Sequence, residues 1–159
     1  MVVVRRAGEG DFPELLAVQR EAFAEYLNVY EAAAWTKERL EDISREATDK
    51  VILVAESEGR IVGSVRFWLV GGVCVIRLLS VKPSHQGRGY AKALMKKVEE
   101  LAAEAHKFYV CTMLRTPRNI GLFLSLGYRP ESLLPNHYHN LDLICFAKYC
   151  HPGPIRPSL

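Results

Sequence analysis

The spacing of apolar residues divides the chain into short strands and helices. Apolar runs of strand length, many of them rich in β-branched residues, occur at residues 2–6, 51–56, 60–70, 73–81, 107–113 and 138–148. Apolar residues recur at helical spacing in residues 11–26, 36–47, 91–102 and 116–126. The pattern predicts one domain in which helices pack against a sheet.

Glycines mark the turns between these elements. Ser57-Glu58-Gly59 separates two strand runs and predicts a hairpin, and Gly71-Gly72 leads into the run at 73–81. We therefore expect three consecutive antiparallel strands. Gly127 follows the helical segment at 116–126, where a glycine in the left-handed conformation commonly ends a helix.

The length of 159 residues fits one domain, placed at residues 1–150, and the proline-rich residues 151–159 are predicted to form a flexible tail. The longest uncharged apolar run, Phe67–Ile76, is too short to span a bilayer. The first five residues carry their apolar side chains before their charge, unlike a signal peptide. These features predict a cytoplasmic protein without a membrane partner.

The cysteines and histidines do not form a metal-binding pattern. Three of the four cysteines lie inside strand-like apolar runs, and no C-x-x-C spacing links any of Cys74, Cys111, Cys145 and Cys150. We therefore expect buried, reduced thiols in preference to a disulfide or a metal site. His137 and His139 have no third ligand at metal spacing, so zinc is not expected.

The formal net charge of +3 is unevenly distributed along the chain. Residues 7–50 carry 11 acidic and 5 basic side chains, a net charge of −6, whereas residues 60–130 carry 12 basic and 3 acidic, a net charge of +9. Such fields steer ligands, so a phosphate-rich cofactor would be drawn to the second region and a cationic amine to the first. The basic residues form no continuous run beside stacking aromatics, which argues against nucleic acid as a partner.

A glycine-bearing loop at residues 86–91 (QGRGYA) joins the strand run at 73–81 to the helical segment at 91–102. The first amides of a helix have no intrahelical acceptor and lie at the positive end of its dipole, so they bind anions. Gly87 and Gly89 lack a Cβ, which allows a phosphate to approach the backbone. Three side chains at four-residue intervals add positive charge: Arg88, Lys92 and Lys96. A diphosphate is the expected ligand.

Two common phosphate-binding motifs do not fit this loop. The P-loop pattern G-x-x-x-x-G-K-[ST] is absent. The dinucleotide pattern G-x-G-x-x-G fails at Lys92, which replaces the third glycine, and Phe108 and Tyr109 stand where its acidic residue would be. Neither ATP nor NAD is favoured. A solvated glycine turn is the remaining alternative, although the strand, Pro83, Gln86 and the helix together favour a phosphate site.

The pattern Q-x-x-G-x-A, preceded by L-S-V-K-P and followed by an amphipathic helix, resembles motif A of the GCN5-related N-acetyltransferases, the GNAT family. The segment FLSLGYRP at 123–130 resembles a further motif of that family. The resemblance implies an α/β domain of α+β type, with a mixed, mostly antiparallel sheet of six to seven strands flanked by about four helices. The sheet would splay where the strand at 73–81 meets the next one. The implied activity is transfer of an acetyl group from acetyl-CoA to a primary amine by direct attack in a ternary complex.

The resemblance also implies which residues bind the cofactor. Backbone groups of Leu79, Ser80 and Val81 would bind the pantetheine arm, and the Leu79 N–H, exposed by a β-bulge, would bind the thioester oxygen. Asn119 would lie against pantetheine. The diphosphate would be bound by residues of the glycine loop: Gln86, Gly87, Arg88, Gly89, Tyr90, Ala91 and Lys92.

Two catalytic groups that many family members carry are missing here. Phe123 stands where a tyrosine acid is common, and residues 73–77 contain no carboxylate that could serve as the base. His137 is the candidate base because an imidazole titrates in the useful range. His139 is an alternative for the same reason, and Tyr26 and Cys111 are weaker candidates.

The segment between the first two helices borders the acceptor site in this family, so the resemblance implies acceptor contacts by Tyr26, Tyr30 and Glu31. The acceptor itself, a small molecule or a peptide amine, is not specified. Family members often form homodimers, which this chain could share. The missing tyrosine and glutamate also fit a rival function, a sensor or scaffold that binds acetyl-CoA or CoA with little or no catalysis.

Overall fold

The computed structural model describes residues 2–24, 37–138 and 141–150. Seven strands lie within these residues: β1 (Val3–Arg6), β2 (Val51–Ser57), β3 (Arg60–Val70), β4 (Val73–Val81), β5 (Lys107–Met113), β6 (Arg129–Tyr138) and β7 (Leu141–Tyr149). The described part also contains four α-helices: α1 (Phe12–Phe23), α2 (Leu40–Glu46), α3 (Tyr90–Leu101) and α4 (Pro117–Ser125). The predicted α+β fold is confirmed.

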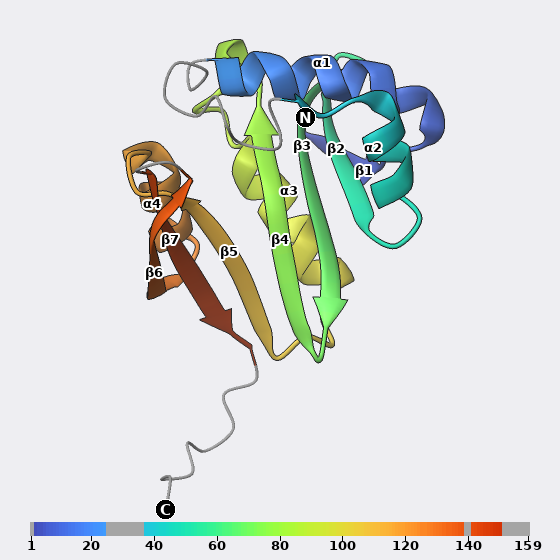
Figure 1. Cartoon of the computed structure of the whole chain (residues 1–159). Helices are drawn as coiled ribbons and strands as arrows, with labels where there is room; N and C mark the ends of the chain where they lie inside the picture. The colour runs from blue at the N-terminus through green and yellow to red at the C-terminus, as the bar shows by residue number, and fades with distance from the viewer. Residues whose placement is uncertain (1, 25–36, 139–140, 151–159) are drawn as a thin grey trace, which may run out of the picture.

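The seven strands form one sheet in the order β1-β2-β3-β4-β5-β7-β6. Only β4 and β5 pair in parallel, through four residue pairs from Val73 with Lys107 to Ile76 with Val110. Beyond Ile76 the two strands separate, so the sheet opens as a V toward the upper end of the view (Figure 1). The predicted splay between these two strands is therefore confirmed.

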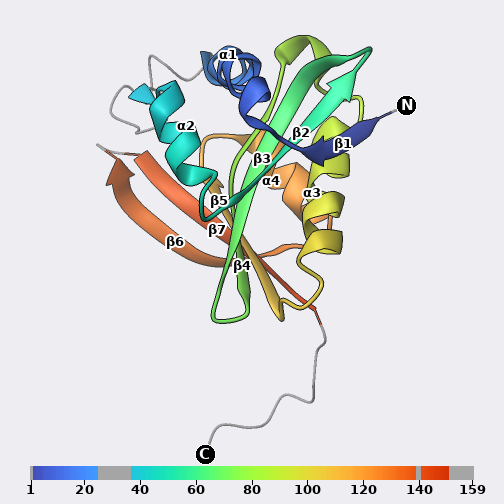
Figure 2. The ribbon, with the colours of Figure 1, turned by 90° about the vertical axis from the view of Figure 1, so that its right-hand side faces the viewer.

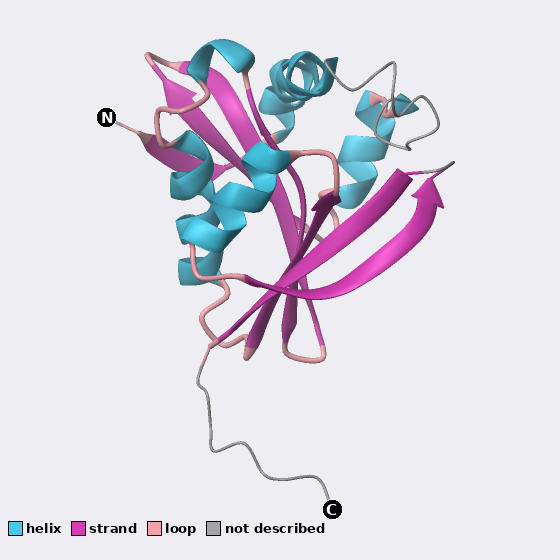
Figure 3. Ribbon diagram, turned by 90° about the vertical axis from the view of Figure 1, so that its left-hand side faces the viewer, coloured by secondary structure: helices cyan, strands magenta, loops and turns pink. Residues whose placement is uncertain are grey.

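Two helices cover each face of the sheet. Helices α1 and α2 lie on one side, and α3 and α4 lie on the other (Figure 2, Figure 3). Leu94, Met95 and Val98 of α3 are fully buried against the sheet, and Leu15 of α1 and Ile43 of α2 are fully buried on the opposite face. None of the helices in the described ranges is long and apolar enough to cross a membrane.

Glycines end several elements where the sequence predicts turns. The β2–β3 turn contains Glu58 (φ 51°) and Gly59 (φ 77°), two consecutive left-handed residues that suit the twist of a hairpin. Gly127, with φ 90°, follows α4, and the next amide, that of Tyr128, donates to the Phe123 carbonyl. This hydrogen bond closes the last turn of the helix.

A buried arginine joins the sheet to α1 and α2. Arg66 of β3 is fully buried, and its guanidinium donates to Gln19 of α1 at 2.9 Å and to the carboxylates of Glu38 and Glu46. Lys50 also contacts Glu46, at 2.7 Å. Burial raises the pKa of Glu46, but Lys50 and Arg66 lower it by more, so its pKa lies below the ordinary value. Sequence patterning gave no sign of this cluster, because Arg66 lies within an otherwise apolar run.

Three predicted elements were misplaced. Residues 129–138 were not predicted as a strand, yet they form β6, and the last strand begins at Leu141 instead of Tyr138. Strand β6 tolerates Pro130 and Pro135 because it lies at the sheet edge and its pairing with β7 is irregular. Helix α2 begins at Leu40, so the predicted start near Thr36 is wrong for residues 37–39.

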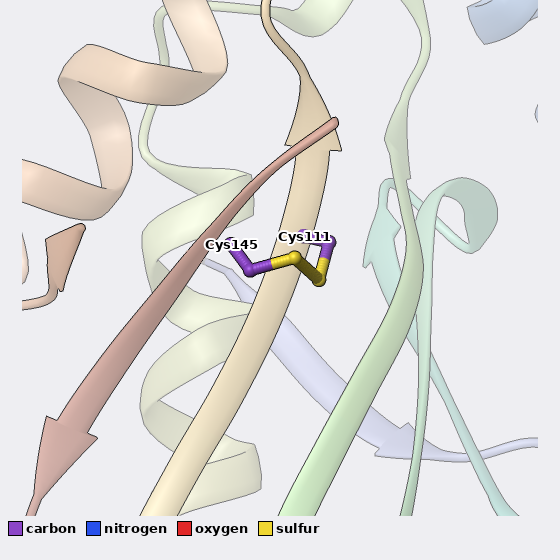
Figure 4. Close-up of a disulfide and its surroundings, with 2 residues drawn as sticks. All are labelled: Cys111 and Cys145. Carbon is purple, nitrogen blue, oxygen red and sulfur yellow. A yellow bond between two sulfur atoms is a disulfide. The ribbon is translucent and has the colours of Figure 1, made fainter. Parts of the chain in front are cut away.

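The prediction of reduced cysteines is wrong for one pair. Cys111 of β5 and Cys145 of β7 are cross-strand partners with Cα atoms 4.0 Å apart, and they form a disulfide (Figure 4). Cys74 is a free, buried thiol, and burial together with Glu104 and Glu99 raises its pKa to about 12. The pairing could not be derived from the sequence because it depends on the register of strands separated by 34 residues.

Candidate functional site

The loop between β4 and α3 presents a row of free backbone amides. Gly87 (φ 76°) and Gly89 (φ 90°) adopt the left-handed conformation, and Gly89 is the N-cap of α3. The first hydrogen bond of α3 runs from the Ala93 amide to the Gly89 carbonyl. Among the described residues, none accepts a hydrogen bond from the amides of residues 87–92. These amides are therefore available to an anion at the positive end of the helix dipole.

Side-chain hydrogen bonds hold this loop against its neighbours. The Gln86 side chain donates from Nε2 to the Val81 carbonyl at 3.2 Å, which ties the loop to the end of β4. Arg118 of α4 donates from Nη1 to Gln86 Oε1 at 2.6 Å. Gln86 therefore connects the strand, the loop and α4, and it fixes the direction in which the loop amides point.

A cavity of about 340 Å³ opens beside the loop, within the size range of small-molecule sites. Of the eleven residues predicted to bind the cofactor, ten line this cavity: Leu79, Ser80, Val81, Gln86, Gly87, Gly89, Tyr90, Ala91, Lys92 and Asn119. Arg88 does not line it. The structure thus brings the predicted residues together, and their contact with a cofactor stays a prediction.

The site contains residues that sequence reasoning did not select. Arg118 lines the cavity next to Asn119 and adds a cation close to the loop. Its position directly before Asn119 in the sequence was the available signal. Ala22 and Phe23 of α1 also line the cavity, although their place in the apolar stripe of the helix is typical of core residues.

Strand β4 changes its geometry where it leaves β5. Arg66 of β3 opposes Arg77, whereas Ser64 opposes Ser80, so one residue of β3 faces both Leu78 and Leu79. Leu78 has a φ of 54°, as expected at a bulge. This confirms the predicted bulge. Because the ladder to β5 ends at Ile76, the β4 edge from residue 77 onward faces the opening of the V and not another strand.

A second cleft, of about 520 Å³, lies in the opening between β4 and β5. It shares Phe23, Leu79 and Asn119 with the first cavity, so the two adjoin at the bulge. Its polar lining includes Arg77 of β4, Tyr109 of β5 and His137 of β6. A ligand could therefore extend from the glycine loop, past the bulge, and meet a second ligand between the strands.

The candidate catalytic residues have different positions. His137 is exposed and lines the second cleft, whereas His139 and Tyr26 lie outside the described residues. Phe123 is buried against Tyr128 and Phe146, with its ring also at the wall of this cleft, and it carries no proton to donate.

Cys111 lines the same cleft, but its sulfur is bonded to Cys145, so it cannot act as a base. Three residues predicted to contact the acceptor also fall outside the described part of the chain: Tyr26, Tyr30 and Glu31.

Comparison with known proteins gives one family. A sequence model of the acetyltransferase (GNAT) family matches residues 15–128. An acetyltransferase of Yersinia pestis (strain Pestoides F) is 28% identical over 129 residues, which span 76% of this chain and 91% of that protein.

Solved structures with the same fold include the ribosomal-protein-alanine N-acetyltransferase from Brucella melitensis. Its TM-score is 0.79 at 22% identity, covering 93% of this chain and 99% of that one. The PaiA N-acetyltransferase from Thermoplasma acidophilum, solved in complex with coenzyme A, also has a TM-score of 0.79, at 15% identity, covering 94% and 99% of the two chains. At these identities the likeness concerns the fold.

Proposed function

The chain belongs to the acetyltransferase (GNAT) family, and from this membership we propose that it moves an acetyl group from acetyl-CoA to a primary amine within a ternary complex. One observation supports this most directly. The glycine loop, whose amides at residues 87–92 have no acceptor among the described residues, borders a cavity that adjoins a second cleft at the β4 bulge, so donor and acceptor have adjoining places.

The glycine loop suits the diphosphate of acetyl-CoA. A Cβ built on Gly87 or Gly89 would meet no protein atom within 4 Å, so the space above both glycines is open to a phosphate. Lys92 and Arg118, which line the same cavity, supply positive charge. The amides would bind the phosphate oxygens through charge-assisted hydrogen bonds, which are stronger than neutral ones.

The open edge of β4 suits the pantetheine arm. An extended chain can add to an unpaired strand edge through backbone hydrogen bonds. The edge at residues 79–81 leads from the loop to the bulge, and Asn119 faces it across the boundary of the two cavities. The Asn119 side chain is oriented by donating to Thr112 Oγ1 at 3.1 Å.

The bulge supplies a hydrogen-bond donor for the thioester oxygen. In our proposal the Leu79 N–H donates to the thioester oxygen and stabilises the negative charge that develops when the amine attacks. Removing a preorganised donor of this kind costs an enzyme about 10²–10³ in kcat. Because the donor is a backbone group, this role survives the loss of the usual catalytic side chains.

Proton transfer from the amine is the step that most needs help. A lysine-like amine with a pKa of about 10.4 costs about 4.6 kcal/mol to deprotonate at pH 7, whereas release of a thiol with a pKa of about 8.5 as thiolate costs about 2 kcal/mol. A base therefore matters more than an acid, and the absence of a tyrosine at Phe123 is the less serious loss. We assign the base role to His137, which lines the acceptor cleft.

A second function, an acetyl-CoA sensor or scaffold without turnover, is favoured by the lining of the second cleft, which contains no carboxylate among the described residues. Two measurements separate the functions: calorimetric titration with acetyl-CoA, and release of free CoA over a panel of amines. Binding with turnover supports the transferase. Binding without turnover on any amine supports the sensor, and absence of binding at millimolar acetyl-CoA overturns both.

The role of His137 is tested by the variant His137→Gln. Loss of the base should lower kcat at pH 7. Affinity for acetyl-CoA should not change, since His137 does not line the first cavity. An unchanged kcat would assign deprotonation to water or to another group.

A further inference from the structure

The described lining of the second cleft carries a positive charge, which is unexpected for a site that binds a cationic amine. Arg77 is exposed, lines the cleft and is the only residue with a permanent formal charge among the described residues of its lining. In the described part of the chain no carboxylate contacts its guanidinium. A primary amine arrives as a cation, so a cleft built for a simple amine or a polyamine would be expected to present the opposite charge.

The neighbouring strand β3 explains why the described residues offer Arg77 no carboxylate. Arg77 and Arg66 are cross-strand partners, so their side chains leave the same face of the sheet. The carboxylates of Glu38 and Glu46 are both bound to Arg66, and Lys50 shares Glu46. Arg66 and Lys50 therefore match the charge of the two carboxylates. Among the described residues no carboxylate is left to pair with Arg77, which faces the cleft.

The rest of the lining is mainly apolar. Leucines and other apolar side chains reach the cleft from four strands and α1: Val75, Leu78, Met113, Leu134, Leu143 and Phe23. A ligand that fits this lining has an apolar body, an amine that reaches the bulge, and an anionic group that pairs with Arg77. Arg77 stands two residues before Leu79, with the bulge between them. An amino acid has its amine and its carboxylate on one carbon, so its amine can reach the bulge while its carboxylate pairs with Arg77.

We propose that the acceptor is an amino acid with an apolar side chain, whose carboxylate is bound by Arg77 while its α-amine attacks the thioester. This inference rests on the proposed acetyltransferase function and names its substrate class. Arg77 then has a second effect. A nearby positive charge lowers the pKa of an ammonium group, so the guanidinium also lowers the cost of deprotonating the amine in a cleft whose described lining holds no carboxylate base.

The test compares leucine with leucinamide, which has the same shape but no carboxylate, and adds spermidine as a cationic acceptor. A carboxylate raises the pKa of its neighbouring ammonium, so chemistry alone favours leucinamide as the nucleophile. The wild-type protein is expected to show a kcat/KM for leucine about 10- to 100-fold above that for leucinamide, the range for a hydrogen-bonded charged group.

The variant Arg77→Gln should lose about 10- to 100-fold in kcat/KM for leucine and change little for leucinamide. Arg77→Lys should restore part of the loss. Arg60→Gln is the matched control, because Arg60 is an exposed arginine on the same strand as Arg66 and six residues away, about 20 Å. Arg60→Gln should leave kcat/KM unchanged for both leucine and leucinamide.

The outcomes distinguish the inference from its premise. Wild-type turnover of leucinamide or spermidine at or above that of leucine overturns the amino-acid acceptor and leaves the acetyltransferase function standing. An equal fall in kcat/KM for leucine and for leucinamide in Arg77→Gln also overturns the amino-acid acceptor and leaves the acetyltransferase function standing. If acetyl-CoA binds but none of the three acceptors is turned over, the proposal is overturned, and the wider amine panel then decides whether the transferase function falls with it.

Discussion

Gly87 and Gly59 have nearly the same φ and equally open surroundings, but only Gly87 lines the first cavity. Comparing the two positions therefore isolates the proposed phosphate contact. Gly87 in the loop has a φ of 76° and Gly59 in the β2–β3 turn has a φ of 77°, and a Cβ at either would meet no protein atom within 4 Å. Gly87 lines the first cavity and Gly59 does not. Alanine at either position therefore imposes the same backbone strain, but only at Gly87 does the methyl group enter the space assigned to a phosphate.

The strain of alanine in the left-handed region is about 1–2 kcal/mol. A chain of 159 residues unfolds with an entropy of about 0.33 kcal/mol per kelvin, so each variant should lower Tm by about 3–6 °C without ligand. Acetyl-CoA at 100 times its Kd stabilises the wild-type protein by about 2.7 kcal/mol, which raises Tm by about 8 °C.

Gly87→Ala should lose most of that ligand effect. Loss of about 2 kcal/mol of charged hydrogen bonding weakens Kd about 30-fold, which leaves a Tm rise of about 2–3 °C at the same acetyl-CoA concentration. Gly59→Ala should keep the full rise of about 8 °C. Differential scanning calorimetry with and without acetyl-CoA measures both. Equal ligand shifts in the two variants would refute the assignment of the loop to the diphosphate.

Three further predictions concern the scaffold. Arg66→Met should cost about 3–5 kcal/mol, a fall in Tm of about 9–15 °C, because it removes the buried guanidinium that pairs with the partly buried carboxylates of Glu38 and Glu46, and a fall below about 3 °C would contradict this. Thiol titration of the unfolded, unreduced chain should find two thiols, rising to four after reduction, whereas four in both cases would exclude the bond between Cys111 and Cys145. Hydrogen bonds from Arg5 lower the pKa of Asp11 to about 2. Asp11→Asn should therefore lower the free energy of unfolding by about 1 kcal/mol or less at pH 7. In urea unfolding, this difference from wild type should disappear as the pH falls from about 4 to 2 and the carboxylate of the wild-type protein becomes protonated.

The elements that the sequence predicted well are those whose signal is local. The hairpin at Glu58-Gly59 and the cap at Gly127 follow from the glycines themselves, and the glycine loop follows from its place between a strand and a helix. Leu79 and Asn119 line both cavities, and their contact with pantetheine stays a prediction. Local backbone chemistry and a single motif were sufficient for these features.

The features that were missed depend on contacts between distant segments. Strand β6 was overlooked because Pro130 and Pro135 argue against a strand, and only its position at the sheet edge makes them tolerable. The partners of Arg66 come from α1, α2 and the residue Glu38 before α2, so no window of sequence contains them. The place of Arg77 in the second cleft and its register with Arg66 likewise follow only from how the strands are arranged.

The four residue pairs between β4 and β5 have a mechanical consequence. They are the only ladder within the sheet that joins strands β1–β4 to strands β5–β7 across the described residues, so the angle between the two groups can change by straining few hydrogen bonds. A coenzyme that contacts both groups of strands would restrain the angle between them. Hydrogen–deuterium exchange should then slow on both sides of the gap, in β4 and in β5, when acetyl-CoA is added.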